Sequence, residues 1–261
     1  MPTSTRPLAL VTGASTGIGF ELARCCASEG FDLLLAADTD LARAIQCCTE
    51  LGAHVDAVQV DLSTITGVEA LLAELGGRRV AALLANAGHG LGHAFLDQSW
   101  KDIRHVIDTN ITGTVYLVHV IASSMSEQRA GRILVTGSIA GFQPGTYQAV
   151  YNATKAFIDS FALALHEELE GSGVTISCLM PGVTDTEFFW RADMLDTRVA
   201  TGSKMDPADV ARIGFDAMMA GEADVVAGWR NKVQVAMSRV VPAEALAALH
   251  ARIARPGGAY E

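Results

Sequence analysis

The sequence lacks concentrated positive charge, a long apolar run and a leader segment. Its 19 Lys and Arg residues are scattered among 29 Asp and Glu residues, and the formal net charge is −10. Nucleic acids and anionic membranes bind clustered basic side chains, so we exclude both as partners. No stretch reaches the roughly 18 apolar residues of a membrane-spanning helix, and the N-terminal stretch MPTSTRPLALVTGAS has neither the apolar core nor the cleavage site of a signal peptide. We therefore expect a cytoplasmic protein.

The cysteines fit neither a disulfide framework nor a zinc site, because their number is odd and no CxxC pair occurs. They are Cys25, Cys26, Cys47, Cys48 and Cys178. We expect free thiols in a reducing compartment. His89 and His93 stand four residues apart in a glycine-rich stretch with no third ligand nearby, and we interpret them as solvated loop or lid residues. No metal site is expected.

The chain does have a high apolar content, 50% of 261 residues, in short runs that alternate with longer segments of helical periodicity. Such alternation predicts βα units and a parallel sheet with helices on both faces. The predicted strands are Leu8–Thr12, Asp32–Ala37, Val55–Val60, Val80–Ala85, Arg132–Thr136, Val174–Met180 and Asp224–Ala227. The predicted helices lie near Gly17–Ser28, Asp40–Leu51, Thr64–Glu74, Ser99–Ser126, Ala149–Glu170 and Pro207–Met219.

No linker or repeat divides the chain, so we predict one α/β domain over residues 1–261, with a Rossmann-like, doubly wound, seven-stranded parallel sheet. The longest irregular piece, Pro181 to Asp206, is long enough to be functional.

A glycine-rich turn, TGASTGIG, joins the first predicted strand to the first predicted helix. Its glycines allow a tight turn and let backbone N–H groups approach a pyrophosphate at the positive end of the helix. Later strand ends add an acidic residue suited to an adenine amino group and a small turn that would lie against the adenosine ribose. Since ligands of open parallel sheets bind beyond the carboxyl ends of the strands, these features predict a dinucleotide site. The residues are Gly13, Gly17, Gly19, Asp61, Asn86, Ala87 and Gly88.

Three residues suited to proton transfer follow the fifth predicted strand: Ser138, Tyr151 and Lys155. Four residues apart on a helix, Tyr151 and Lys155 share a face, which brings the ammonium near the phenol. A free tyrosine titrates near pH ~10, and a nearby cation favours the phenolate. Lowering that pKa by about three units requires roughly 4 kcal/mol, which a lysine together with an oxidised nicotinamide can supply.

In order and spacing these motifs closely resemble the short-chain dehydrogenase/reductase (SDR) family. The resemblance covers nearly the whole chain through TGASTGIG, Asp61, NAG, Asn110 in DTNITG, Ser138, YNATK and PGVTDT. It implies that Tyr151 is the general acid in reduction and the general base in oxidation, while Ser138 donates a hydrogen bond to the substrate oxygen. It also implies that Lys155 holds the nicotinamide ribose and lowers the pKa of Tyr151.

The same resemblance implies that Asn110 holds a relay water through its backbone carbonyl and that the segment after Pro181 fixes the nicotinamide carboxamide. Tyr151 and Lys155 would also touch the cofactor. Further cofactor residues implied by the resemblance are Ser15, Thr16, Ile18, Leu62, Pro181, Gly182, Val183, Thr184 and Thr186.

The choice between NAD and NADP rests on the adenosine ribose, where a carboxylate accepts from the 2′-hydroxyl and an arginine pairs with a 2′-phosphate. SDR proteins that use NADP often carry a basic residue before the second glycine of the turn or just after the second strand. This chain has Thr16 and Asp38 at those places. The family's usual ribose-binding aspartate stands one place earlier, where this chain has Ala37. Asp38 therefore argues more firmly against a 2′-phosphate than for a ribose clamp, and we predict NAD as cofactor with NADP as the alternative.

The stretch TEFFWRADMLDTRVATGSK lies where SDR proteins carry a substrate lid, and its apolar and aromatic residues favour a bulky hydrophobic alcohol or ketone. The alternative is a short amphipathic helix that packs on the domain. Predicted substrate contacts are Ser138, Phe142, Gln143, Tyr147, Phe188, Phe189 and Trp190. The tail from Trp229 has the pattern of an amphipathic helix for subunit contact. Since SDR proteins are often dimers or tetramers, we expect a homo-oligomer.

We predict an enzyme that interconverts a secondary alcohol and a carbonyl compound with NAD(H). Residues 1–130 are expected to bind mainly the dinucleotide, and residues 131–261 to carry the reacting residues, the substrate lid and a C-terminal helix. An NADPH-dependent carbonyl reductase is the alternative of the same fold. A catalytically idle dinucleotide-binding regulator is the alternative of another class, and it predicts damage to Ser138, Tyr151 or Lys155, which are all present. A nucleotide-sugar epimerase needs a larger C-terminal domain than the chain provides after its seventh predicted strand.

Overall fold

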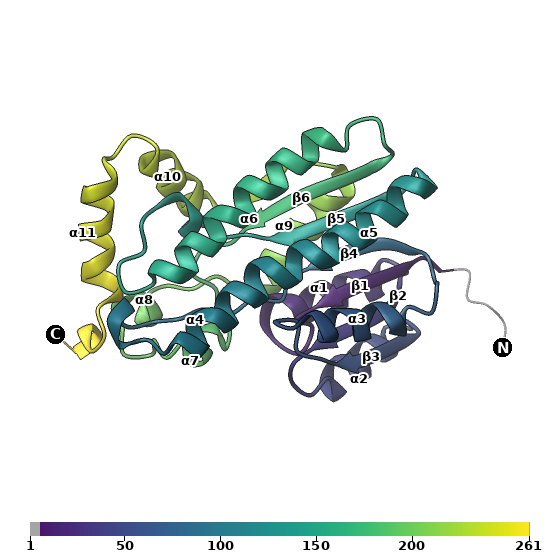
Figure 1. Ribbon diagram of the computed structural model, residues 1–261, viewed down its shortest axis with the longest axis horizontal. Helices are drawn as coiled ribbons and strands as arrows, with labels where there is room; N and C mark the ends of the chain where they lie inside the picture. The colour runs from purple at the N-terminus through teal and green to yellow at the C-terminus, as the bar shows by residue number, and fades with distance from the viewer. Residues whose placement is uncertain (1–5, 261) are drawn as a thin grey trace.

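The computed structural model describes residues 6–260, which contain a seven-stranded sheet in the order β3-β2-β1-β4-β5-β6-β7 (Figure 1). Every neighbouring pair of these strands is parallel. The strand order runs outward from β1 to β3 on one side and from β4 to β7 on the other, so it reverses between β1 and β4. This is the predicted doubly wound arrangement. The strands are β1 Leu8–Thr12, β2 Asp32–Ala37, β3 Val55–Gln59, β4 Val80–Ala85, β5 Gly131–Thr136, β6 Val174–Met180 and β7 Asp224–Val226.

Helices cover both faces of the sheet. One face packs against α1 Gly17–Ser28, α2 Ala42–Glu50 and α9 Pro207–Ala220, and the other against α3 Ile65–Glu74, α5 Thr114–Gln128 and α6 Ala149–Glu168. Strand β1 shows the reason, because Leu8 and Leu10 belong to one apolar cluster while Ala9 and Val11 belong to the other. Side chains alternate along a strand, so a strand buried on both faces is apolar throughout.

The single helix predicted over residues 99–126 is divided. It consists of α4 Trp100–Ile107, a π-helical turn η2 Asp108–Gly113, and α5. A Cβ atom added to Gly113 would lie 2.0 Å from the carbonyl oxygen of Leu62, so the turn packs directly on the chain that follows β3. π-turns are frequent at functional sites, and this one contains Asn110.

Helix boundaries differ from the predicted ones by one or two residues where a side chain caps the helix. The hydroxyl of Ser99 accepts a hydrogen bond from the backbone N–H of Asp102 at 3.1 Å, and that of Thr64 accepts from Gly67 at 3.0 Å. A capping residue precedes the first helical residue, so α4 begins at Trp100 and α3 at Ile65.

The segment from Pro181 to Asp206, predicted to be irregular, contains two short helices, α7 Phe188–Arg191 and α8 Arg198–Thr201. The C-terminal part forms α10 Trp229–Ser238 and α11 Ala243–Ala254, and further short turns are η1 Phe95–Asp97, η3 Ile139–Phe142 and η4 Gly258–Tyr260. Helices α10 and α11 lie beyond the carboxyl ends of the strands, and α11 contacts α8 (Figure 1). The tail therefore packs on its own domain, beside the predicted lid.

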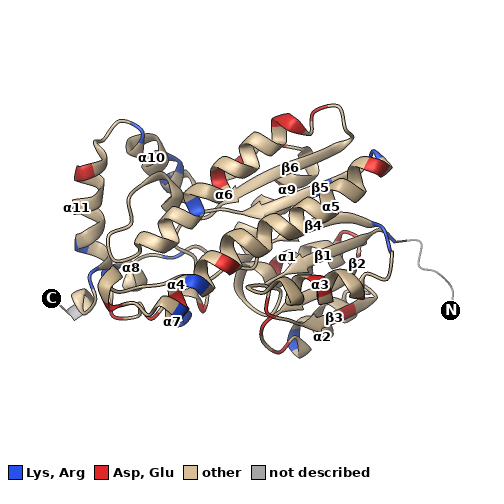
Figure 2. Ribbon diagram, in the orientation of Figure 1, with Lys and Arg blue, Asp and Glu red and all other residues tan. Residues whose placement is uncertain are grey.

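The distribution of charged residues and the state of the cysteines can be compared with what the composition predicted. Acidic and basic residues are interspersed over the elements in Figure 2, and no continuous basic face is seen in that view. All five cysteines are free thiols, as predicted. Within residues 6–260, no helix combines the length and the apolar character needed to cross a membrane.

Candidate active site

One cavity of about 640 Å³ lies at the carboxyl ends of the strands, on the side where the strand order reverses. Its wall runs from the glycine-rich turn after β1 to Ser138, Tyr151 and Lys155 after β5 and on α6. It includes every predicted cofactor residue except Gly19. Cavities of this size hold small-molecule ligands. The predicted nucleotide site and the predicted reacting residues thus belong to a single site.

The glycine-rich turn is shaped by backbone conformations and contacts that exclude side chains. Gly13 and Gly17 have φ values of +64° and +57°, in the left-handed region that glycine adopts without strain. A Cβ atom on Gly19 would lie 2.0 Å from the carbonyl oxygen of Gly13. Gly19 therefore does not line the cavity but lets α1 pack closely on the turn. Thr16 makes no side-chain cap, so the first amides of α1 remain available to an anionic ligand.

Thr12, at the end of β1, fixes the turn that follows β4. Its hydroxyl accepts hydrogen bonds from the backbone N–H groups of Asn86 and Ala87, both at 3.0 Å. The Asn86 side chain is held in turn by Thr136, whose hydroxyl donates to Oδ1 at 3.1 Å. The sequence analysis missed Thr12, although a polar residue that ends an apolar strand just before the glycine-rich turn is a usable signal.

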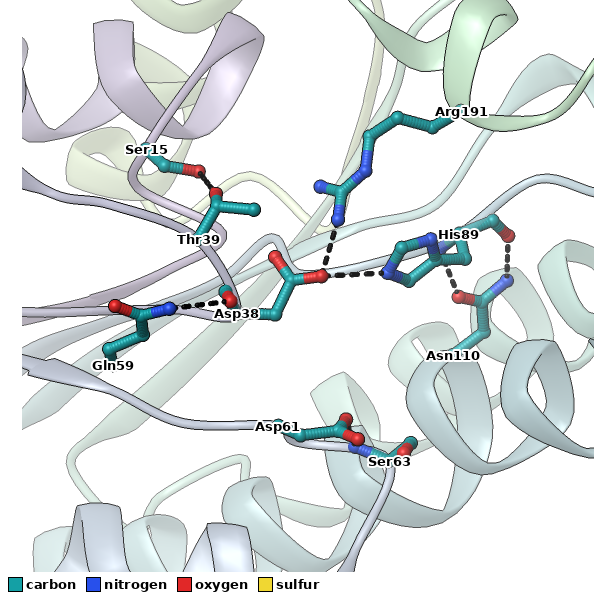
Figure 3. Close-up of polar contacts among 9 residues, drawn as sticks. All are labelled: Ser15, Asp38, Thr39, Gln59, Asp61, Ser63, His89, Asn110 and Arg191. Atoms are coloured by element: carbon teal, nitrogen blue, oxygen red, sulfur yellow. Dashed lines mark hydrogen bonds and ion pairs between the residues drawn. The ribbon is translucent and has the colours of Figure 1, made fainter.

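Asp38 follows β2 directly, and its charged side chain lines the cavity. Ala37, the last residue of β2, belongs to the apolar cluster on one face of the sheet. The Asp38 carboxylate accepts from the guanidinium of Arg191, and Nε2 of His89 lies 3.4 Å from the same oxygen (Figure 3). Hydrogen bonding by His89, and then by Arg191, holds the pKa of Asp38 well below its usual range despite partial burial. Asp38 is therefore a carboxylate at neutral pH.

His89 lies in a loop, as predicted, but the prediction that its side chain is solvated was wrong. Its side chain is only 16% exposed, and its ring lies 4.5 Å from the ring of His105, whose pKa is lowered by burial and by His89. His93 does contact the lid, since Nε2 lies 2.9 Å from a carboxylate oxygen of Asp193. Within residues 6–260, no group of three potential ligand side chains converges on a metal site.

Asp61 follows β3, the strand beside β2, and lines the same cavity as Asp38 (Figure 3). Its Oδ1 accepts from the backbone N–H of Ser63 at 2.9 Å. Burial by itself would raise the pKa of Asp61, but the hydrogen bonds from Ser63 lower it. The carboxylate is therefore kept ionised and oriented.

Tyr151 and Ser138, the residues predicted to react, line the cavity, and both side chains are buried. Burial raises the pKa of Tyr151 to about 12, and the Ser138 hydroxyl acts in the opposite direction. Nζ of Lys155 lies 5.9 Å from the centre of the Tyr151 ring and donates to the carbonyl oxygen of Thr136 at 2.7 Å. We predicted that Lys155 lowers the pKa of Tyr151. With the protein's own residues alone, that pKa is raised instead, because the effect of burial is the largest.

A buried carboxylate that the sequence analysis missed, Asp159, lies behind these residues. Its Oδ1 accepts from the backbone N–H of Ser138 at 3.2 Å and from the thiol of Cys178 at 3.6 Å, while Oδ2 has no partner among the described residues. Burial raises its pKa to about 6. A Cβ on Gly137 would lie 1.8 Å from Oδ1, so this glycine makes room for the carboxylate. The spacing from Tyr151 through Lys155 to Asp159, four residues each, was an available signal.

Asn110 is buried in the π-turn and joins it to the loop after β4. Its Oδ1 accepts from the backbone N–H of His89 at 2.8 Å, and its Nδ2 donates to the carbonyl oxygen of His89 and to the Thr154 hydroxyl, both at 2.9 Å. Thr154 lies beside Lys155 on α6. The side chain of Asn110 therefore fixes the positions of both cavity walls, which is a role the sequence analysis did not assign.

The predicted lid lies against the part of the cavity that contains Tyr151. The ring of Phe188 lies 5.1 Å from that of Tyr151, and a Cβ on Gly90 would lie 2.4 Å from Phe188, so the glycine permits this closure. Of the predicted substrate residues, Ser138, Gln143, Phe188 and Phe189 line the cavity. Phe142, Tyr147 and Trp190 do not: the first two pack on apolar clusters, and Trp190 is 65% exposed.

The C-terminal helices also contribute to the cavity wall, which the sequence analysis did not foresee. Trp229 from α10, and His250 and Ile253 from α11, are among the lining residues. His250 is anchored through Nδ1, which lies 2.9 Å from the carbonyl oxygen of Thr146. The amphipathic pattern of this tail was visible, but the sequence did not show which surface the tail packs against.

Several known proteins that this chain resembles are dehydrogenases or dehydrogenase/reductases by name. A family model described as short chain dehydrogenase matches residues 7–194. The serine 3-dehydrogenase of Agrobacterium fabrum is 32% identical over 203 residues, covering 77% of this chain and 78% of that protein. Among solved structures, a short chain dehydrogenase/reductase from Burkholderia phymatum in complex with NAD has a TM-score of 0.80 at 27% identity, covering 88% of this chain and 92% of that chain. A short-chain dehydrogenase from Sphingobium yanoikuyae in complex with NADPH has a TM-score of 0.78 at 26% identity, covering 90% and 94%.

Proposed function

The chain belongs to the short chain dehydrogenase family and is an oxidoreductase of that family, and on this premise we propose that it interconverts a secondary alcohol and a carbonyl compound with NAD(H). One observation carries the proposal: Ser138, Tyr151 and Lys155 line the same cavity as the glycine-rich turn. Two hydroxyls that can hold a carbonyl oxygen thus share a wall with a turn suited to a pyrophosphate. The Agrobacterium relative is named a dehydrogenase of a hydroxyl compound, which supports the same reaction class.

The residues present fit a nicotinamide dinucleotide. The open amides at the start of α1 would hold the pyrophosphate, Asp38 and Asp61 the adenosine, and Lys155 the second ribose. The close approach of Gly19 to the carbonyl of Gly13 leaves the cavity side of the turn free of side chains. Thr184 and Thr186 follow β6 and lie in the same wall, where they would orient the nicotinamide end.

A bound nicotinamide supplies the hydride in reduction and accepts it in oxidation. Because burial raises the pKa of Tyr151 to about 12, its phenol is protonated at neutral pH and can donate a proton to the substrate oxygen in reduction. Ser138 holds that oxygen with a second hydrogen bond. In oxidation Tyr151 would accept the alcohol proton as phenolate, so positive charge beside the buried phenol is required. Lys155, with Nζ 5.9 Å from the ring centre, does not by itself outweigh burial, so an oxidised nicotinamide would have to supply positive charge together with it. Phe188, whose ring lies 5.1 Å from that of Tyr151, would limit the access of water to the reacting atoms.

Asp38 supports NAD over NADP. A carboxylate that is ionised at neutral pH repels a 2′-phosphate and accepts from a 2′-hydroxyl. The substrate is proposed to be bulky and apolar, because apolar side chains from η3, the segment after β6 and the C-terminal helices line the cavity, among polar ones such as Gln143, Gln234 and His250. The apolar residues are Ile139, Phe188, Phe189, Val199, Met205, Trp229 and Ile253.

A screen of ketones and secondary alcohols of graded size, run with NADH, NADPH and their oxidised forms, tests the proposal through absorbance at the reduced nicotinamide band. We expect turnover with a higher kcat/KM for NADH than for NADPH, and a rise in kcat/KM as apolar groups are added to the ketone. A higher kcat/KM for NADPH would overturn the cofactor assignment. Tight nucleotide binding without turnover of any substrate in the series would favour the idle regulator.

A further inference from the structure

Arg191, the last residue of the lid helix α7, reaches across the cavity to Asp38 at the end of β2. The two residues are 153 positions apart in the sequence. Figure 3 shows Arg191 and His89 converging on one carboxylate from two different segments, the lid and the loop after β4. The Arg191 and Asp38 side chains are 26% and 33% exposed, so the ion pair is partly shielded from water. The lid thus touches the part of the cavity where the adenosine ribose is proposed to bind.

The two contacts use the same carboxylate oxygen. Arg191 donates to Oδ2 of Asp38, and Nε2 of His89 lies 3.4 Å from Oδ2. Among residues 6–260, nothing donates to Oδ1 (Figure 3). A carboxylate oxygen has two lone pairs, so Oδ1 can accept from a neutral ribose hydroxyl while the Arg191 pair stays intact. A 2′-phosphate has no proton to donate to Oδ1 and instead competes with Asp38 for the guanidinium.

Resting on the nicotinamide-dependent function proposed above, we propose that Arg191 is a second determinant of nucleotide choice, contributed by the lid. While Asp38 is present, Arg191 is neutralised by it, and the site selects an unphosphorylated ribose. If the carboxylate is removed, Arg191 and His89 become free donors at the same place and bind a 2′-phosphate. The preference for NAD then depends on the pair and not on Asp38 alone. Arginine is well suited to this role because its planar fork of donors matches phosphate geometry.

Binding of two adenosine nucleotides to the full-length protein tests this without any turnover. The probes are 5′-AMP and adenosine 2′,5′-bisphosphate, which differ only in the 2′-phosphate, titrated by isothermal calorimetry. The variants are Asp38→Asn, Arg191→Gln and the double variant. Arg212→Gln is the matched control, since Arg212, on α9, pairs with Glu29 at the end of α1, and neither residue lines the cavity.

We expect Asp38→Asn to bind the bisphosphate about 10- to 100-fold more tightly than wild type does, the range for a charge-assisted hydrogen bond. The double variant should lose most of this gain, keeping only the part that comes from removing the Asp38 charge and from His89, while its affinity for 5′-AMP stays close to that of Asp38→Asn. Arg212→Gln should bind both probes as wild type does. If Asp38→Asn is poorly folded, Asp38→Ser removes the same charge and should give the same gain.

A double variant that binds the bisphosphate as tightly as Asp38→Asn would overturn the role of Arg191. The same holds if Asp38→Asn and Asp38→Ser show no gain. These outcomes leave the proposed function standing as long as wild type binds 5′-AMP and NADH. If wild type binds no adenosine nucleotide at all, the proposed function itself fails, and the role of Arg191 fails with it.

Discussion

Replacing Asp159 by Asn is expected to stabilise the protein increasingly as the pH rises. Burial raises the pKa of Asp159 from 3.8 to about 6 in the folded protein, so the folded state binds this proton more tightly than the unfolded chain does. The stability contributed by protonated Asp159 is complete below pH ~4 and is lost as the pH rises through about 6. A shift of about two units at ~1.36 kcal/mol per unit gives a loss of about 3 kcal/mol.

Asparagine has nearly the same shape as aspartate, and its Oδ1 can still accept from the backbone of Ser138. Because the side chain carries no charge, this loss with pH is absent in the variant. Urea denaturation of both proteins at intervals between pH ~4 and ~8 measures the difference, since the other titrating groups largely cancel. The free energy of unfolding of the variant should rise relative to wild type by up to about 3 kcal/mol between pH ~4 and ~7 and then level off.

Asp97→Asn is the matched control, because Asp97 is an exposed residue of η1 with no side-chain hydrogen bond among the described residues. It should give a difference that changes little with pH. A difference between Asp159→Asn and wild type that is constant from pH ~4 to ~8 would refute the assignment of a raised pKa to this buried carboxylate.

Two further predictions concern the nucleotide end. Thr12→Val removes the acceptor of two backbone N–H groups in the turn after β4. We therefore expect the free energy of unfolding, measured by urea denaturation, to fall by about 2 to 4 kcal/mol relative to wild type. NADH binding, measured by fluorescence titration, should become weaker. An unchanged midpoint would contradict the role of Thr12. Gly19→Ala would place a Cβ 2.0 Å from the carbonyl oxygen of Gly13, so we expect NADH binding to fall by at least about 10-fold, or folding to fail. Gly202→Ala, where the added Cβ meets nothing closer than 3.5 Å, should bind NADH as wild type does.

Local and periodic features could be predicted from the sequence. The strands of the sheet follow from apolar runs. The glycine-rich turn lies between β1 and α1, and Tyr151 and Lys155 lie four residues apart on α6, so short spacing already places the members of each group together. The helix over residues 99–126 shows the limit of periodicity. The apolar pattern continues through the π-turn, and only the contact of Gly113 with Leu62 and the hydrogen bonds of Asn110 with the loop after β4 show why the helix widens there.

Contacts between distant segments could not be predicted. Arg191 meets Asp38 because the lid folds back over the end of β2, and no pattern in either segment indicates the other. The pKa of Tyr151 depends on how deeply α6 buries the phenol, and a helical wheel shows only that Lys155 shares its face. In the same way, the tail looked amphipathic, but its packing on the cavity through His250 and Ile253 depends on the tertiary fold.

The central claim is that Tyr151 exchanges the proton with the substrate oxygen while a nicotinamide carries the hydride, and Tyr151→Phe tests it most directly. The substitution removes one oxygen from a buried ring and leaves Ser138, Lys155 and the glycine-rich turn unchanged. NADH affinity, measured by fluorescence titration, should stay within about 2-fold of wild type, while kcat for the best ketone of the screen should fall by ~10² to ~10⁴, the usual contribution of a general acid. A kcat equal to that of wild type would contradict the account.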